Sequence, residues 1–254
     1  MKKKISALML LSLLSVVLLS GCTSDQPASV ALRSDESPNK LVANQPAQET
    51  DAKRIGASED NKVELYAIKE SKNGIEGATL AVNGQQKDFD WEIPDMGTQP
   101  QVFYTDLTGD GQEEAVIIIQ TGRGTGLDMY DIHVINAEDL SEISIQSYED
   151  IVAEQIESNV AKNGDDTLAI SVKTQGKEYN FNYGFDPAPD YHQDRLYFGG
   201  VVVYSLENQK IKLNLPGSVG VSPHYVSDFN VTYKFDRAGN QFIVDQIEFE
   251  PVEI

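Results

Sequence analysis

The sequence predicts a mainly β protein: an antiparallel sandwich or curled sheet with one short α-helix, preceded by a signal peptide and a disordered tether. Three observations support this class. Apolar and polar residues alternate in many short runs after about position 62, and clusters of Gly, Asn, Asp and Pro separate these runs. Before that position no such alternation is sustained.

The first 21 residues read as a secretory signal peptide. Three lysines at positions 2–4 precede an apolar run from Ile5 to Leu19, which is the order of segments in such signals. The run of roughly 15 residues is shorter than the ~20 that a membrane-spanning helix needs. We therefore expect the segment to be cleaved and not kept as a membrane span.

The motif Leu19-Ser20-Gly21-Cys22 follows this run. It resembles the lipobox of bacterial lipoproteins, which implies cleavage before Cys22, lipidation of its thiol, and a place on the extracytoplasmic face of a cell membrane. Two acyl chains anchor a protein stably, whereas one gives only marginal binding. Cys22 is the sole cysteine, so no disulfide is expected. The alternatives are an ordinary signal peptide with a chance cysteine, or an uncleaved helix.

Charge restricts the partners. Removal of the signal leaves 17 basic against 40 acidic residues, a formal charge of −23. Such a surface repels nucleic acid and anionic lipid head groups, so neither is expected as a partner. It favours cations or a basic partner.

Residues 22–61 are predicted to be a lipidated, disordered tether. They are rich in Ser, Asp, Gln, Pro, Ala and Asn, with no apolar period of 2 or 3.6. A flexible chain of this length spans about 35 Å, enough to lift a domain off the bilayer. Residues 62–254 are then one mainly β domain, a length that suits a single core.

Strands are expected wherever apolar residues alternate with polar ones. The segment Ala78–Val82 leads into Asn83-Gly84, a strong signal for a two-residue hairpin turn, with Phe89 and Trp91 on the returning strand. Val63, Leu65 and Ala67 alternate before it. Further strands are expected at 102–105, 115–120, 129–135, 168–174, 178–183, 201–206, 210–215, 229–235 and 242–249.

One segment departs from this pattern. Ser147 can cap a helix from about Tyr148 to Ser158, with acidic residues in its first turn. Ile151, Val152 and Ile156 would face inward. We expect this to be the single helix of the domain.

The segment Asp106–Glu114 is a candidate Ca²⁺ site between two expected strands. Ca²⁺ takes six to eight oxygen ligands, and a tight loop can supply them from alternate positions. Gly111, at position 6, permits the sharp bend. The donors at positions 1, 3, 5, 7 and 9 are Asp106, Thr108, Asp110, the Gln112 carbonyl and Glu114.

This loop, followed by the apolar run Ala115–Ile119, resembles the calcium loop of FG-GAP or VCBS repeats, which occur in integrin-α propellers. The wider block of residues 100–136 resembles uncharacterised surface lipoproteins of Bacillus-like bacteria that carry one such repeat. The resemblance implies Ca²⁺ and an extracellular setting, without naming an activity. Position 3 is Thr and position 9 is Glu where the repeat usually has other acidic or amide residues, so only three carboxylates remain.

An EF-hand, a propeller blade and a metal-free turn are the alternatives for this loop. An EF-hand is excluded because position 12 is Ile117 and the flanks are strands. A multi-bladed propeller is excluded because no second copy of the loop exists. The alternative to Ca²⁺ is a metal-free turn in which Asp106 and Asp110 accept hydrogen bonds from nearby backbone amides. If Ca²⁺ binds, few carboxylates predict a weak, structural site with Kd near 10⁻⁴–10⁻³ M.

Two other segments invite functional readings. The glycine-rich stretch Gly122–Gly126 is followed by a strand and not by a helix that could hold a phosphate, so no nucleotide is expected. The segment Asp186–Arg195 contains three carboxylates and His192, which could serve acid–base chemistry, although a solvated connection is the commoner meaning. No catalytic residues are assigned.

Aromatic residues alternate along the later strands, as expected of a β core and its rim. A sugar-binding aromatic platform is the alternative. The residues concerned are Tyr179, Phe181, Tyr183, Tyr197, Phe198, Tyr204, Tyr225, Tyr233 and Phe235.

These features predict a membrane-anchored extracytoplasmic lipoprotein: a calcium-stabilised binding or adhesion module for an envelope protein or polysaccharide. The alternatives are a small envelope hydrolase or accessory subunit that uses the Asp186–Arg195 segment, and a sensory lipoprotein. Turnover that is lost on mutation of Asp190 and His192 would favour the hydrolase.

Overall fold

The computed structural model describes residues 52–163, 166–185 and 191–252. The predicted signal peptide, Cys22 and most of the tether lie outside the described residues. The described part is mainly β with one short helix, which confirms the predicted class. Its elements are β1 Arg54–Ala57, β2 Val63–Ser71, β3 Gly74–Val82, β4 Gln85–Pro94, β5 Gln101–Thr105, β6 Glu114–Gly124, β7 Leu127–Asn136, β8 Glu142–Ile145, α1 Tyr148–Gln155, β9 Ile156–Lys162, β10 Thr167–Thr174, β11 Lys177–Gly184, β12 Val201–Glu207, β13 Lys210–Asn214, β14 Gly217–Val219, β15 His224–Asp236 and β16 Gln241–Pro251.

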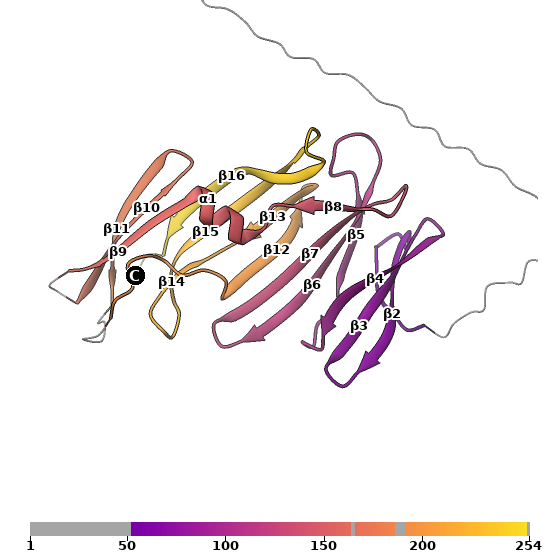
Figure 1. Cartoon of the computed structure of the whole chain (residues 1–254), viewed down its shortest axis with the longest axis horizontal. Coiled ribbons are helices and arrows are strands. Elements are labelled where there is room, and N and C mark those ends of the chain that lie inside the picture. The colour runs from indigo at the N-terminus through magenta and orange to yellow at the C-terminus, as the bar shows by residue number, and fades with distance from the viewer. Residues whose placement is uncertain (1–51, 164–165, 186–190, 253–254) are drawn as a thin grey trace, which may run out of the picture. The chain divides into compact units, whose positions relative to one another are not determined.

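The strands form three hydrogen-bonded sheets. β1 to β4 make an antiparallel meander in chain order, and β9 to β11 make a three-stranded sheet in the order β11-β10-β9. The other nine strands make the third sheet, which lies between these two in Figure 1. The meander and the small sheet are thus at opposite ends of the third sheet.

The third sheet closes on itself as a barrel of six strands. Its path runs β12-β13-β15-β16-β8-β7, and a parallel pairing of β12 with β7 joins the two ends. This closing contact is short, because only Val201 and Val202 pair, with Asp128 and Met129 respectively. Closure leaves these strands without open edges at the join.

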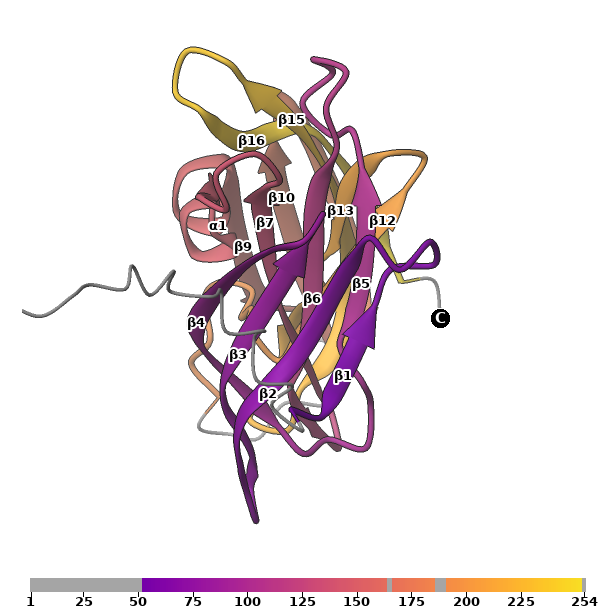
Figure 2. The ribbon, with the colours of Figure 1, turned by 90° about the vertical axis from the view of Figure 1, so that its right-hand side faces the viewer.

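β6 divides the interior into two hydrophobic cores. Val116 and Ile118 point into the barrel core, whereas Ala115, Ile117 and Ile119 point into a second core under the β1–β4 meander. Figure 2 shows this meander lying across β5 and β6. The whole run from Ala115 to Ile119 is buried, which explains why it is apolar at every position and not at alternate ones.

Local signals located the hairpin and the helix correctly. Asn83 and Gly84 have φ of 49° and 83° and join β3 to β4, as their sequence predicts. Ser147 caps α1, its side chain accepting a hydrogen bond from the Asp150 amide, and Ile151 is fully buried. No helix in the described segments is long and apolar enough to cross a membrane.

The helix ends earlier than predicted. We expected it to reach Ser158, but it stops at Gln155, because Ile156 begins β9 and pairs with Thr174 of β10. The partner strand therefore overrides the local helical pattern. Strand β9 was missed for this reason.

The tether prediction was wrong at its C-terminal end. Residues 54–57 form β1, which pairs with β2 and buries Ile55 to 6% exposure. A four-residue strand with one buried apolar side chain has no period that a sequence pattern can reveal. β8 and β14 were missed because they are equally short.

Candidate functional site

The loop between β5 and β6 is a turn organised by its own carboxylates. The two carboxylate oxygens of Asp106 accept hydrogen bonds from the Gly109 and Gly111 amides, at 2.7 and 3.0 Å. Asp110 Oδ1 accepts one from the Gln112 amide at 2.9 Å. Gly109 and Gly111 have φ of 70° and 92°, a conformation that glycine adopts without strain. These are the side-chain-to-amide hydrogen bonds of Asx-type turns.

Glu114 is the buried member of the loop. It is 2% exposed, and its Oε2 accepts hydrogen bonds from the Leu107 and Thr108 amides at 2.7 and 3.3 Å. Burial raises the pKa of the Glu114 carboxyl, the two amide hydrogen bonds oppose this, and the charges of Asp110 and Asp106 add to the rise. Of the three carboxylates of the loop, Glu114 is therefore the buried one, whereas Asp110 is exposed.

A cation from a distant turn lies against the other side of the loop. Arg237, in the β15–β16 turn, donates hydrogen bonds to the carbonyls of Thr108 and Gly109, at 3.4 and 3.0 Å. The sequence offered no signal for this contact, because 128 residues separate Arg237 from Gly109. The guanidinium offsets part of the negative charge of the loop.

The donor set fits Ca²⁺ in its chemistry, since every candidate ligand is an oxygen. In the described part of the chain, however, no three acidic, histidine or cysteine side chains are grouped as a metal site would need. Asp106 and Glu114 serve backbone amides instead. Ca²⁺ would therefore have to share these carboxylates with the backbone amides, and Asp110, the other carboxylate of the loop, is exposed.

The glycine-rich stretch Gly122–Gly126 is only partly the predicted turn between β6 and β7, because Gly122 to Gly124 are still paired within β6. β6 ends at Gly124 and β7 begins at Leu127. The Tyr225 hydroxyl donates a hydrogen bond to the Gly126 carbonyl at 2.7 Å, which ties the turn to the β15 strand.

Half of the candidate hydrolase segment, residues 186–190, lies outside the described residues. In the described half, His192, Asp194 and Arg195 are exposed. The Asp194 carbonyl accepts a hydrogen bond from the Val160 amide at 2.8 Å, so this stretch runs along β9. The hydrolase reading stays a prediction.

His133 pairs with an acid that the sequence did not connect to it. Its Nδ1 lies 2.6 Å from Glu142 Oε1, and its ring stacks on Trp91 at 4.3 Å between centroids. Phe89 stacks on the opposite face of Trp91 at 4.2 Å. The stack of Phe89, Trp91 and His133 joins β4 to β7, and so attaches the meander to the barrel sheet.

Most of the aromatic residues pack in the core, but Tyr197 does not. Tyr204 and Tyr233 are buried in the barrel, and burial raises the pKa of the Tyr204 hydroxyl to about 12. Tyr197 is 50% exposed and lines a groove of about 660 Å³ between α1 and residues 195–198. The groove also contains Tyr148, Val152, Glu157, Arg195 and Phe198.

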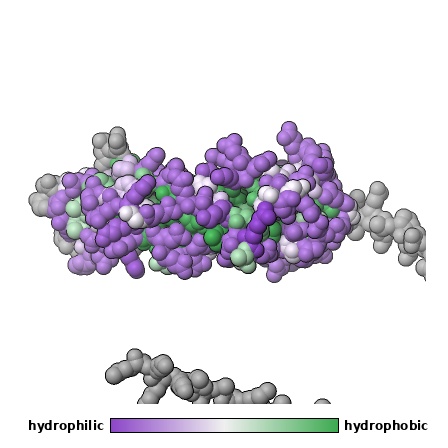
Figure 3. Space-filling view, turned by 90° about the horizontal axis from the view of Figure 1, so that it is seen from above, coloured by the Kyte–Doolittle hydropathy of each residue, from purple (hydrophilic) through white to green (hydrophobic). Residues whose placement is uncertain are grey.

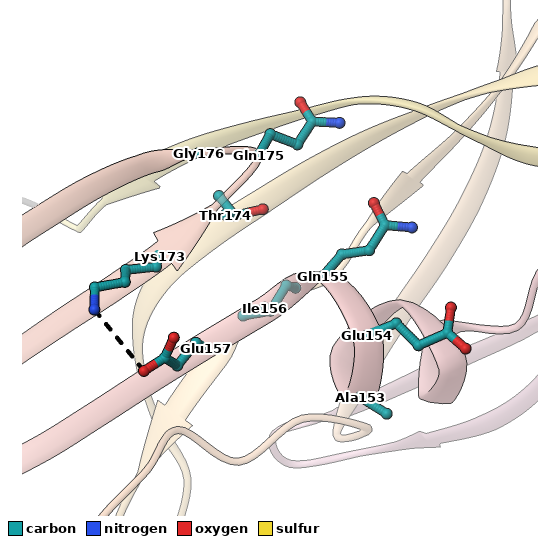
Figure 4. Close-up of a pocket in the computed structure, with 9 residues that line it drawn as sticks. All are labelled: Ala153, Glu154, Gln155, Ile156, Glu157, Lys173, Thr174, Gln175 and Gly176. Atoms are coloured by element: carbon teal, nitrogen blue, oxygen red, sulfur yellow. Dashed lines mark ion pairs between the residues drawn. The ribbon is translucent and has the colours of Figure 1, made fainter. Parts of the chain in front are cut away.

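A second, polar cleft of about 510 Å³ lies between the end of α1 and the β10–β11 turn (Figure 4). The Thr174 hydroxyl is buried there without a hydrogen-bond partner in the described structure. Gln175 is already used: its amide nitrogen donates to the Asp245 carbonyl, and its amide oxygen accepts from the Ile247 amide. The cleft is thus a gap beside a docked turn, and we assign it no ligand.

No protein-family model, curated protein or solved structure matches the chain. The site must therefore be judged on its own chemistry. Seen from above, most of the surface is hydrophilic, with small apolar areas between (Figure 3). Against this background, the groove with Tyr197 combines an exposed aromatic ring, a cation and carboxylates in one concave surface.

The raised pKa of Glu114 predicts a specific pH dependence of stability. Because the folded-state pKa lies above the unfolded value, the folded state binds the proton more tightly, and stability falls as pH rises from about 4.5 through the folded pKa. Glu114→Gln should remove this slope, which for one group is at most about 1.4 kcal/mol per pH unit.

Urea unfolding of both proteins across this range measures the difference, with Glu113→Gln at the exposed neighbour as control. A wild-type slope that survives in Glu114→Gln would contradict the assignment.

Proposed function

We propose that the protein is a lipid-anchored, extracytoplasmic binding module that contacts a component of the cell envelope. The lipobox at Leu19–Cys22 supports the anchor. The acidic composition supports a setting away from nucleic acids. The module is non-enzymatic in this proposal, and the hydrolase and the sensory lipoprotein are its rivals.

The observation that carries the binding role is the groove beside α1. Exposed aromatic side chains in a concave surface offer large contact area at little entropic cost, and they are enriched where proteins bind partners. Tyr197 is half exposed there, while Tyr148 and Phe198 form the groove walls and Arg195 adds a cation. The groove has a volume of about 660 Å³ and opens to solvent, so a polymer or a protein surface could enter it.

We further propose that Ca²⁺ binds weakly at Asp106–Glu114 and has a structural role. The support is electrostatic: Asp106 and Asp110 lie close enough to Glu114 to raise its pKa, and a divalent cation would offset this repulsion. Arg237 and the amide hydrogen bonds already offset part of it, so we expect weak binding. Thr108 and the Gln112 carbonyl complete the proposed ligand set.

Lipidation is tested by replacing Cys22. The Cys22→Ser chain should be released from membranes or left unprocessed, because the proposed acylation site is gone. Incorporation of a labelled lipid precursor and membrane fractionation measure this. A processed Ser variant that still fractionates with membranes would refute the anchor.

The binding role is tested by the groove itself. Tyr197→Ala should weaken co-sedimentation of the protein with native envelope material by about five- to thirtyfold, the effect of losing one or two kcal/mol at a buried aromatic contact. Ile68→Ala is the matched control, because Ile68 is also 50% exposed but lies on the β1–β4 meander. Equal effects of the two substitutions would exclude the groove as the binding surface.

The calcium role predicts a modest thermal shift. With about 2 mM Ca²⁺ and a Kd of roughly 0.1–1 mM, the native state gains ~0.6–1.8 kcal/mol, or about 1–7 °C in Tm. Asp110→Ala should abolish the shift. Asp139→Ala should keep it, because Asp139 accepts a hydrogen bond from the Ser141 amide in a similar turn outside the loop. Differential scanning calorimetry after chelation measures both. No shift in the wild type, or a full shift in Asp110→Ala, would leave the loop a plain hydrogen-bonded turn.

A further inference from the structure

The outer face of the β9–β11 sheet is an ordered array of side chains. The strand registers set the residues in cross-strand rows, each with one member from β9, β10 and β11. The first row is charged, and Lys173 Nζ lies 3.9 Å from Glu157 Oε1 (Figure 4). The next rows are uncharged. The three rows are Glu157, Lys173 and Glu178, then Asn159, Ser171 and Asn180, then Ala161, Ala169 and Asn182.

These uncharged rows enclose a shallow trough of about 330 Å³. Its floor is the small side chains of the central strand, Ala169 and Ser171, and its walls are asparagine amides. The amides keep unused hydrogen-bonding groups: in the described structure Asn180 only donates, to Glu178 at 3.5 Å, and Asn182 only accepts, from Asn163 at 3.2 Å.

The absence of charge in these rows contrasts with the equivalent face of the β1–β4 meander. There, Lys69 pairs with Glu76, and Thr79 donates a hydrogen bond to Asp88. The whole chain has a formal charge of −20. The two uncharged rows of the small sheet therefore differ from the outer face of the meander.

The aromatic ring of Tyr197 lies in the groove that Glu157, a member of the charged first row, also lines. The Leu196 amide donates to Ser158 Oγ at 3.0 Å, which holds the following residue, Tyr197, beside the start of β9. Glu157 lines the groove that contains Tyr197 and also begins the first row of the array. The groove and the trough share no lining residue, but they follow one another along β9, where Glu157 lines the groove and Asn159 lines the trough.

We propose that this surface binds a neutral glycan chain, with Asn159, Asn180 and Asn182 hydrogen-bonding its hydroxyl or acetamido groups and Tyr197 packing on a sugar ring. The proposal rests on the proposed envelope-binding function and names its ligand class. Each amide both donates and accepts, as sugar hydroxyls do. Strands lie about 4.8 Å apart and alternate residues of a strand about 7 Å apart, so the amides are presented at regular intervals. A polymer likewise presents its hydroxyl groups at regular intervals.

The charge and geometry favour this ligand over others. An anionic polymer would meet the acidic surroundings and the carboxylates of Glu157 and Glu178. A peptide that binds by strand addition needs the backbone groups of a sheet edge, whereas the trough offers only side chains on a sheet face. A neutral chain rich in hydroxyls suffers from neither restriction.

The test is titration of the purified full-length protein with chitotetraose, a neutral N-acetylglucosamine tetramer, and with cellotetraose, up to about 10 mM. We expect binding of at least one of them, weakened about two- to tenfold by Asn159→Ala or Asn182→Ala, the usual effect of removing one hydrogen bond. Ala169→Arg should abolish it by filling the trough. Circular dichroism checks that each variant is folded.

The matched control is Gln86→Ala, which removes an exposed amide from the outer face of β4 and should leave binding unchanged. Lack of binding to both tetramers overturns the proposal, and so does binding that the trough variants leave unchanged. Binding of polyglutamate as tight as that of the tetramers also overturns it. The Tyr197→Ala co-sedimentation experiment tests the proposed envelope-binding function independently of these titrations, so the glycan proposal can fail while the proposed function stands.

Discussion

The fold depends on one strand that is buried on both faces. β6 contributes alternate side chains to the barrel core and to the core under the meander, so neither core is complete without it. A strand with two buried faces must be apolar throughout its middle, and it has polar residues only where it leaves the interior. In β6 two buried polar residues flank the apolar run, Glu114 and Gln120, which are 2% and 8% exposed, and the polar residues Thr121 and Arg123 lie beyond Gln120.

Both buried polar residues of β6 have hydrogen-bond partners outside the strand. Glu114 accepts hydrogen bonds from the Leu107 and Thr108 amides, while Gln120 accepts one from Thr98 and donates one to Asp128, each of the latter at 2.7 Å. A buried polar group without a partner would cost about 1–3 kcal/mol. The candidate calcium loop is therefore first a cap on the central strand, and any ion bound there acts on a structure that Glu114 already holds.

Glutamine side chains make hydrogen bonds to backbone groups of β16 that have no partner in the neighbouring strand. β16 has a bulge at Asp245, which leaves backbone groups without ladder partners. The Gln175 amide bonds to the Asp245 carbonyl and to the Ile247 amide, and so fastens the β10–β11 turn to the barrel. Gln146 accepts a hydrogen bond from the Val244 amide nearby. These contacts fix the small sheet that carries the trough.

How much of this the sequence could predict depends on how local each signal is. Asn83-Gly84, the Ser147 cap and the place of the loop between β5 and β6 follow from a few adjacent residues and were predicted. The closure of the barrel at Val201 and Val202, the burial of Glu114 and the Arg237 contact depend on distant partners, and no local pattern indicates them. The trough was missed because its residues look like ordinary solvent-facing positions until the registers bring them together.

The proposed anchor can compensate for the weak glycan binding that we expect at a single trough. A few neutral hydrogen bonds on an open face give low affinity at one site, because each contributes little after water is displaced. A polymer, however, presents its repeat many times, and under the proposed function lipid-anchored copies would share one membrane surface. Once one copy holds the chain, its neighbours bind at a high effective concentration, and avidity can exceed single-site affinity by about 10²–10⁴. On this argument the proposed lipid anchor would contribute to binding as well as to location, because it would supply the multivalency that the open face of the β9–β11 sheet lacks.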